Sequence, residues 1–335
     1  MQAEDDPRPT PPERPEDYMC CGRGCMPCIF DVYDQALTRY EAQLQEWETR
    51  RAGGVVEGYA PSSGVELYYR IAGQGLPLVV IHGGPDFDHK YLLPDIDRLA
   101  DRYRVILYDQ RGRGRSRGEF RLDQLGIDAY VQDLDALRRH LGLMTLAIAG
   151  HSWGGIVAMH YALAYPGRLS HLVLLNSAPA SHDDFVSMRE ERMRRRLDIV
   201  EQLGEFTGGY EAADPAAVAQ FYHLDFGTTF AQREDAARLD LTWTREQILA
   251  GRAIEEKLQE GLFWKPGYTL IPRLAEVRTP TLVVHGALDF IPLDCDAHIA
   301  EAIPGAKLAV LEGSGHFSYL DAPEAMRGAL EAFLG

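Results

Sequence analysis

The sequence has no long apolar run, and none approaches the roughly 18 consecutive apolar residues of a membrane-spanning helix. Positive charge is also in short supply, with 34 Lys and Arg against 50 Asp and Glu and a net charge of −16. Binding to nucleic acid or to anionic lipid requires clustered Lys and Arg, so we expect neither a nucleic-acid nor a membrane partner. The acidic, Pro-rich start resembles neither a signal peptide nor a transit peptide, which predicts a soluble cytoplasmic protein.

Cysteine is scarce, with five residues in 335, and four of them lie in one short stretch: Cys20, Cys21, Cys25 and Cys28. A disulfide-stapled fold would spread its cysteines along the chain, and a chain with 46% hydrophobic residues can bury a core without staples. The spacing of the cluster is compatible with a zinc or iron–sulfur site, in which Cys20 would complete four ligands. A thiol-rich turn that binds no metal is the alternative.

The chain divides into segments of different composition. Residues 1–17 are rich in Pro and charge, which predicts a disordered tail, and 18–52 combine the cysteines with a helical pattern. Apolar runs alternate with helical patterns over 55–179 and 276–335, which predicts an α/β fold with a mostly parallel sheet between helices. A helix-rich interruption at 180–275 predicts an inserted lid.

Seven runs predict the strands of this sheet: 65–71, 76–82, 103–109, 144–150, 169–179, 281–286 and 307–313. Between the second and third of these runs, LLPDIDRLADR predicts a helix. The last helix is expected to begin at Asp321 as its cap, with Pro in the first turn.

Residues 150–154 read GHSWG, a G-x-S-x-G motif between a predicted buried strand and a helix. The two glycines of the motif, Gly150 and Gly154, allow a turn so tight that the Ser152 hydroxyl is exposed on a strained corner. A serine hydroxyl needs a base to take its proton, and in this arrangement the acid and the His follow in chain order. Asp289 and His316 each follow a predicted strand, so all three side chains should meet at one edge of the sheet.

Other acids and histidines lie near the same edge. Asp294 and Asp296 fall deeper in the loop and are interpreted as solvated or capping residues, and His285 as a packed histidine on its strand. Asp183 and Asp184 follow the preceding strand and are weaker alternatives to Asp289 as the acid.

An early loop, HGGP at 82–85, follows another predicted buried strand. Attack on a carbonyl leaves negative charge on its oxygen, and fixed N–H donors stabilise that charge. One donor should be the N–H of Trp153, which follows the nucleophile, and Gly84 is the expected source of the second.

The motifs HGGP, DQRGRGRS, GHSWGG, GALD and GSGH together resemble the α/β-hydrolase fold, and more narrowly the proline iminopeptidase branch of serine peptidases, over residues 55–335. The resemblance implies a Ser152 nucleophile, an Asp289 acid and a His316 base. It also implies an aminopeptidase that acts on short peptides or amides with a free N-terminal residue. No cofactor is implied for the hydrolase.

Two positions depart from the pattern of that branch. Asp86 stands where the early loop usually ends in Gly, and His151 stands where Gly usually precedes the nucleophile. An aminopeptidase must also hold a free α-amino group, normally with lid carboxylates, and the candidates are Glu190, Glu191 and Glu246. The alternative for each is helix-surface charge.

Two other functions compete with the aminopeptidase: a carboxylesterase or lactonase acting on small esters, and a non-catalytic small-molecule binder. The cysteine cluster with the following CIFDVYDQALTRYE resembles the small "oxidoreductase-like" N-terminal domain. Because no nicotinamide or flavin fingerprint accompanies it, we do not expect redox chemistry from that label.

Overall fold

The computed structural model describes residues 6–20 and 25–335. Its centre is a sheet in the order β1-β2-β4-β3-β6-β7-β8-β9, with β5 paired to β2. The strands are β1 Val56–Ser62, β2 Val65–Ala72, β3 Pro77–Ile81, β4 Arg104–Tyr108, β5 Arg117–Gly118, β6 Leu146–His151, β7 Leu169–Leu175, β8 Thr281–Gly286 and β9 Lys307–Leu311. Pairing is antiparallel from β1 to β4 and parallel from β4 to β9, which confirms the predicted fold class.

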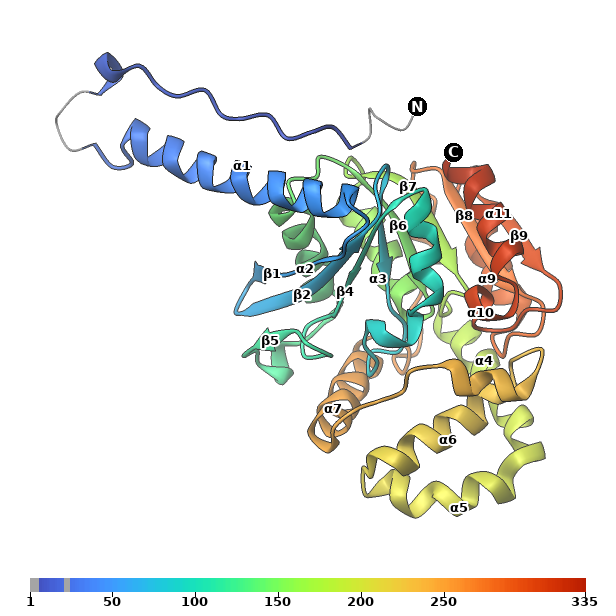
Figure 1. Cartoon of the computed structure of the whole chain (residues 1–335). Helices are drawn as coiled ribbons and strands as arrows, with labels where there is room; N and C mark the ends of the chain where they lie inside the picture. Colours follow the sequence, from blue (N-terminus) through green and yellow to red (C-terminus); the bar gives the residue numbers. More distant parts are fainter. Residues whose placement is uncertain (1–5, 21–24) are drawn as a thin grey trace.

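Both faces of the parallel strands are buried, which explains their continuous apolar runs. In β3, Leu78 and Val80 point into one core and Val79 and Ile81 into the other, because successive side chains alternate between faces. The helices α2 (Ile127–His140) and α3 (Trp153–Ala164) cover one face, and α11 (Pro323–Leu334) packs on the other (Figure 1).

Several elements differ from the sequence prediction at points where backbone geometry intervenes. The helix expected in LLPDIDRLADR is the 3₁₀ helix η3 (Asp95–Asp101). Another 3₁₀ helix, η2 (His89–Leu92), ends where that segment begins, and Pro94, which has no N–H to continue a helix, lies between the two. The strand expected over 169–179 ends at Leu175, because Asn176 has φ 46°. The last helix starts at Pro323 with Ala322 as its cap, and α10 (Ser318–Asp321) precedes it.

Residues between β7 and β8 are helical and cover the carboxyl edge of the sheet (Figure 1). The helices are α4 His182–Arg196, α5 Val200–Glu211, α6 Pro215–Gly227, α7 Arg245–Gly261 and α8 Ile271–Leu274, with η5 Leu197–Ile199 and η6 Arg233–Arg238 between them. We refer to this part as the lid. The described helices include none with both the length and the apolar character to cross a bilayer.

At the other end of the molecule, α1 (Ile29–Arg51) projects from the body, and residues 6–16 run extended beside it (Figure 1). Asp6 is buried and accepts from Arg50 at 2.7 Å, and its carbonyl accepts from Trp47 at 3.1 Å. Of the tail expected to be disordered over 1–17, residues 1–5 lie outside the described residues. Because a buried guanidinium needs a counter-charge, Asp6 ties the segment to the helix.

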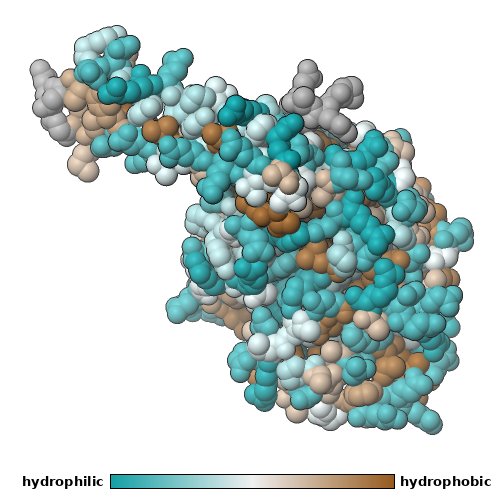
Figure 2. Space-filling model, viewed as in Figure 1, coloured by the Kyte–Doolittle hydropathy of each residue, from teal (hydrophilic) through white to brown (hydrophobic). Residues whose placement is uncertain are grey.

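The same helix is joined to the sheet by charge. Arg50 donates to the carbonyl of Gly73 at 3.1 Å, and Arg104 on β4 pairs with Glu46. The far end of the projection instead exposes apolar side chains, some of which are seen at the upper left of Figure 2. They are Tyr18, Met19, Met26, Ile29 and Val32.

Candidate active site

Ser152 lies in the turn between β6 and α3, with φ 54° and ψ −121°. A non-glycine residue pays for positive φ, so the surrounding structure must hold this conformation in place. A Cβ at Gly150 would lie 2.4 Å from the carbonyl oxygen of Gly154, and one at Gly154 would lie 2.3 Å from that of Ile81. The glycines of the motif are therefore required by close backbone contact, as the tight turn predicts.

Asp289 and His316 follow β8 and β9, and the structure brings them together. His316 Nδ1 lies 3.0 Å from both carboxylate oxygens of Asp289. The carboxylate also accepts from the side chain of Asn176 at 2.8 Å and from the N–H of Ile291 at 3.0 Å. Burial alone would raise the pKa of Asp289, but His316 and the N–H of Ile291 hold it below its ordinary value. Asp289 is therefore an ionised acceptor that orients the imidazole.

Ser152 and His316 line one cavity of about 240 Å³. Among the described residues, neither the Ser152 hydroxyl nor Nε2 of His316 has a hydrogen-bond partner, so both are available to a ligand. Hydrogen bonds of this kind often shorten only when substrate is bound. Aromatic rings form much of the cavity wall: Phe87, Tyr91, Tyr210, Tyr222, Phe226, Phe290 and Phe317.

The early loop packs directly against the elbow. A Cβ on Gly83 would lie 2.8 Å from that of Ser152, and Gly84 has φ +44°, which favours glycine. The N–H of Gly83 donates to the Tyr91 hydroxyl at 2.5 Å. By contrast, the N–H groups of Gly84 and Trp153 donate to no other group in the described ranges. Both predicted oxyanion donors are therefore unoccupied beside Ser152.

His151 is buried and links the elbow to the loop that carries the base. Its Nε2 donates to the carbonyl of His316 at 2.8 Å, so Nδ1 is the acceptor for the Tyr91 hydroxyl at 2.7 Å. Burial and the charge of His316 lower the pKa of His151 to about 3. The residue is therefore a neutral structural link over the physiological pH range.

The lid side of the cavity carries two carboxylates, Asp86 and Glu255. Asp86 accepts from the Tyr222 hydroxyl at 2.8 Å, and Glu255 accepts from Gln259 at 2.6 Å. Burial, together with the negative charge of Asp86, raises the pKa of Glu255 to about 8. Two acids that share a closed cavity repel each other, which favours a cation between them or a proton on one of them.

The three glutamates predicted for amine binding are not among the residues that line this cavity. Glu190 and Glu246 are exposed, and Glu191 pairs with Arg194 and Arg195, whose proximity lowers the pKa of Glu191 to about 2. Sequence reasoning missed Glu255. The sequence contains a signal for its burial, because Glu255 lies between Ile254 and Leu258, which belong to the buried face of α7.

Two arginines of α4, Arg192 and Arg196, also line the cavity. Both pair with Asp225 on α6, which is buried. Burial alone would raise the pKa of Asp225, but the two guanidiniums lower it to about 2. One ionised carboxylate therefore faces two cations.

The alternative acids have other partners. Asp296, expected to be a solvated or capping residue, is fully buried and accepts from His285 at 2.8 Å, because α9 (Leu293–Ala302) packs it against β8. Burial raises the pKa of Asp296 to about 6. Asp184 pairs with His298, while Asp183 and Asp294 are exposed. None of these carboxylates contacts His316.

Potential metal ligands lie close together at one place in the described ranges. The group there that could hold an ion is Asp88, His89 and Asp109. Asp109 already accepts from His89 at 2.7 Å, and Lys90 supplies a cation 3.5 Å from Asp88. This arrangement needs no metal.

In the cysteine cluster, Cys20 and Cys25 are exposed and Cys28 is half-buried. Cys21 lies outside the described residues, so the zinc or iron–sulfur hypothesis stays a prediction.

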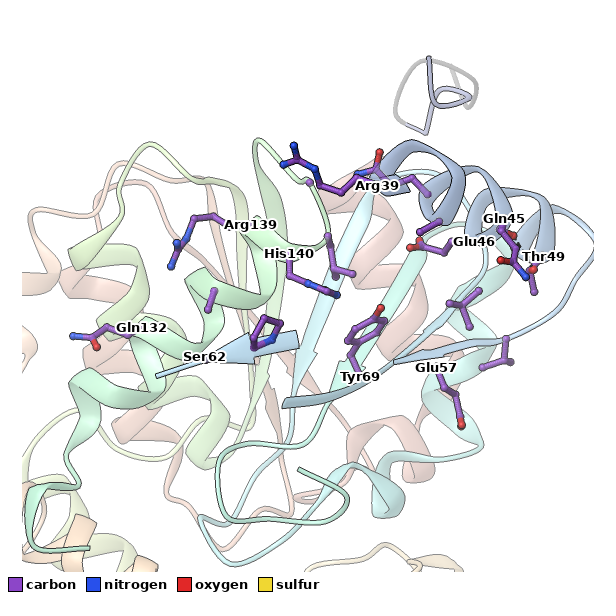
Figure 3. A pocket seen from close by; sticks show the side chains of 18 of the residues that line it. Arg39, Gln45, Glu46, Thr49, Glu57, Ser62, Tyr69, Gln132, Arg139 and His140 are labelled. Atoms are coloured by element: carbon purple, nitrogen blue, oxygen red, sulfur yellow. Dashed lines mark hydrogen bonds between the residues drawn. The ribbon is translucent and has the colours of Figure 1, made fainter. Parts of the chain in front are cut away.

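A wider hollow of about 1160 Å³ lies elsewhere, between α1, the first two strands and α2. Figure 3 shows Glu46, Tyr69, Arg139 and His140 on its walls. The charged groups here already have partners, since Glu46 pairs with Arg104 and Arg139 with Asp135. No nucleophile and base meet in this hollow, so the cavity at Ser152 is the candidate active site.

Comparison with protein families agrees with this architecture. The family model described as "alpha/beta hydrolase fold" matches residues 77–323, and the chain therefore belongs to the α/β-hydrolase family. A second model, "Oxidoreductase-like protein, N-terminal", matches residues 6–49, the segment that includes most of α1.

Relatives define the branch within that family. The chain is 30% identical over 288 residues to a proline iminopeptidase of Clostridioides difficile (strain 630), covering 81% of this chain and 94% of that protein. A crystal structure of a Mycobacterium smegmatis proline iminopeptidase superimposes with a TM-score of 0.63 at 24% identity, over 83% of this chain and 97% of the other. A Thermogutta terrifontis esterase gives 0.62 at 23% identity, over 83% and 98%, and shows the fold alone. The chain is a proline iminopeptidase-like α/β hydrolase.

Proposed function

We propose that the chain is a serine hydrolase that works by acyl transfer, with Ser152 as nucleophile, His316 as base and Asp289 as the acid that orients it. The observation that carries the proposal is the Asp289–His316 pair at 3.0 Å, opening into the same cavity as a serine held at φ 54°. A hydroxyl on a strained corner beside an oriented imidazole is the arrangement that activates an otherwise weak nucleophile.

In the proposed reaction, Ser152 Oγ attacks the substrate carbonyl while His316 Nε2 takes its proton. The N–H groups of Gly84 and Trp153 stabilise the charge on the carbonyl oxygen, and Asp289 stabilises the imidazolium. His316 then protonates the leaving group, which departs. Water, deprotonated by the same imidazole, attacks the acyl-serine ester and releases the acid.

The preferred substrate is a short peptide or amide with a free N-terminal residue. Asp86 supplies negative charge for an α-ammonium group in this cavity of about 240 Å³, and Glu255, whose pKa burial and Asp86 raise to about 8, adds a second negative charge when the ammonium displaces its proton. Its aromatic walls suit an apolar ring such as that of proline. The similarity to proteins named proline iminopeptidases supports the same substrate class.

A serine-directed fluorophosphonate probe tests the chemistry. We expect labelling of the wild-type protein and none of Ser152→Ala, with Ser63→Ala, in the exposed turn between β1 and β2, as the matched control. Absence of labelling in folded wild type, or labelling that survives Ser152→Ala, would favour the non-catalytic binder.

Substrate class is tested by comparing prolyl amides with short acyl esters that have no amine. We expect a higher kcat/KM for the prolyl amides. A preference for the esters, with labelling intact, would replace the aminopeptidase with the esterase or lactonase.

A further inference from the structure

The cavity has a basic side that the proposed aminopeptidase reaction does not use. Asp225 accepts from Arg192 Nε at 3.0 Å and from Arg196 Nε and Nη2 at 2.6 and 2.7 Å. Asp225 offsets one of the two guanidiniums. Glu255 also lines the cavity and its charge acts on Arg192, but burial raises the pKa of Glu255 to about 8, so a positive charge remains on this part of the cavity wall while Glu255 is protonated.

Both guanidiniums also keep donors unused. Within the described part of the chain, Nη1 of Arg192 and Nη1 of Arg196 donate to no other group. A partly buried guanidinium with a free N–H in a cavity is a group that proteins use to bind carboxylate. These two side chains therefore offer a site for an anionic group of the substrate.

The guanidinium of Arg192, which belongs to this basic side, lies near His316. The Arg192 guanidinium is 5.0 Å from the centre of the Phe290 ring, and that ring is 4.6 Å from the imidazole of His316. His316 donates the proton to the departing amine, so the leaving residue lies on this side. Asp86, by contrast, follows the loop of Gly84.

We propose that Arg192 and Arg196 bind the C-terminal carboxylate of a dipeptide, so that the enzyme prefers dipeptides over longer peptides and over amides. This inference rests on the proposed function. In a dipeptide, one Cα separates the α-ammonium group from the scissile carbonyl. One Cα likewise separates the scissile nitrogen from the C-terminal carboxylate. The two charges therefore match Asp86, which follows the loop of Gly84, and the guanidiniums of Arg192 and Arg196, which lie next to Phe290 or pair with Asp225.

A longer substrate places an uncharged peptide group where the dipeptide has its carboxylate. The guanidiniums then lose a charge-assisted partner and are partly desolvated without compensation. Selectivity should therefore appear in kcat/KM as a penalty on every substrate whose carboxylate is blocked or displaced.

The test compares prolyl-glycine with prolyl-glycinamide, which differ only in the terminal charge. For the wild type, we expect kcat/KM to be about tenfold higher for the dipeptide, the size expected of a hydrogen-bonded charge pair. Arg196→Gln should lower the value for the dipeptide much more than the value for the amide. Arg194→Gln, an exposed residue of the same helix that pairs with Glu191, is the matched control and should keep the preference.

The outcomes separate the two proposals. Equal kcat/KM values for dipeptide and amide in the wild type would overturn the proposed carboxylate site but would not contradict the proposed aminopeptidase activity. This comparison uses only the wild-type protein, so it does not depend on whether a variant folds. A dipeptide preference that persists in both Arg196→Gln and Arg192→Gln would overturn it as well. Hydrolysis of neither compound would refute the proposed function itself.

Discussion

The edge of the parallel sheet and the lid above it supply the two halves of the candidate active site, and they are built by different rules. At the sheet edge, Ser152 and Asp289 follow β6 and β8, which are paired on both sides, and His316 follows β9, which pairs with β8. In the lid, Glu255 and Arg192 reach the cavity from helix faces set by packing alone. The strand ends therefore carry the proposed catalytic residues, and the helices carry the residues proposed to bind substrate.

The largest expected effect comes from comparing two single variants, each of which replaces a buried carboxylate near the sheet edge. Asp289→Asn should reduce kcat about 10⁴-fold, because an amide fails to hold the imidazole in the required tautomer. Asp296→Asn is the control, since Asp296 is equally buried but partners His285. Steady-state kinetics with a prolyl amide measures both. Similar losses for the two variants would mean that the acid has been assigned to the wrong residue.

The variant Glu255→Gln tests whether the lid binds the amine of the substrate. We expect KM for a prolyl amide to rise about tenfold or more, because a neutral amide replaces the charge that pairs with the ammonium. An acyl ester without an amine should be affected much less. Glu246→Gln on the same helix is exposed and serves as the control. Equal effects of Glu255→Gln on both substrates would contradict a role in amine binding.

The smallest expected effect concerns stability. Burial raises the pKa of Glu255 to about 8, above its value in the unfolded chain, so the folded state favours the protonated acid. The resulting stabilisation is complete below the unfolded pKa and is lost as pH rises through about 8. The melting temperature of Glu255→Gln relative to wild type should therefore increase between pH 5 and pH 9. A difference that is constant with pH would show that Glu255 ionises normally.

Predictions from sequence succeeded where a local pattern has one structural solution. The apolar runs at 76–82 and 281–286 correspond to strands, and GHSWG does form a strained turn with Ser152 at positive φ. One prediction failed where the outcome depended on a partner outside the local pattern. Asp296 was expected to be a solvated or capping residue, but it is buried and accepts from His285 on β8.

The three glutamates predicted for amine binding illustrate the same limit. Helical periodicity identifies a buried face but does not say which cavity that face meets, so Glu190, Glu191 and Glu246 could not be separated from Glu255. Glu191 in fact pairs with Arg195, whose guanidinium donates to the carbonyls of Leu288 and Asp289. Through Arg195, Glu191 therefore helps to hold the loop that carries Asp289 against the lid.

By itself, the sequence determined the layered sheet, the tight turn at the serine and the order of the nucleophile and its two partners, because strand periodicity and glycine sterics act over a few residues. Only the tertiary structure decided which acid reaches His316, which N–H groups stay unpaired beside Ser152, and which lid charges enter the cavity. Those outcomes depend on burial and on Coulomb interactions between residues far apart in the chain, and both are defined only once the helices have packed.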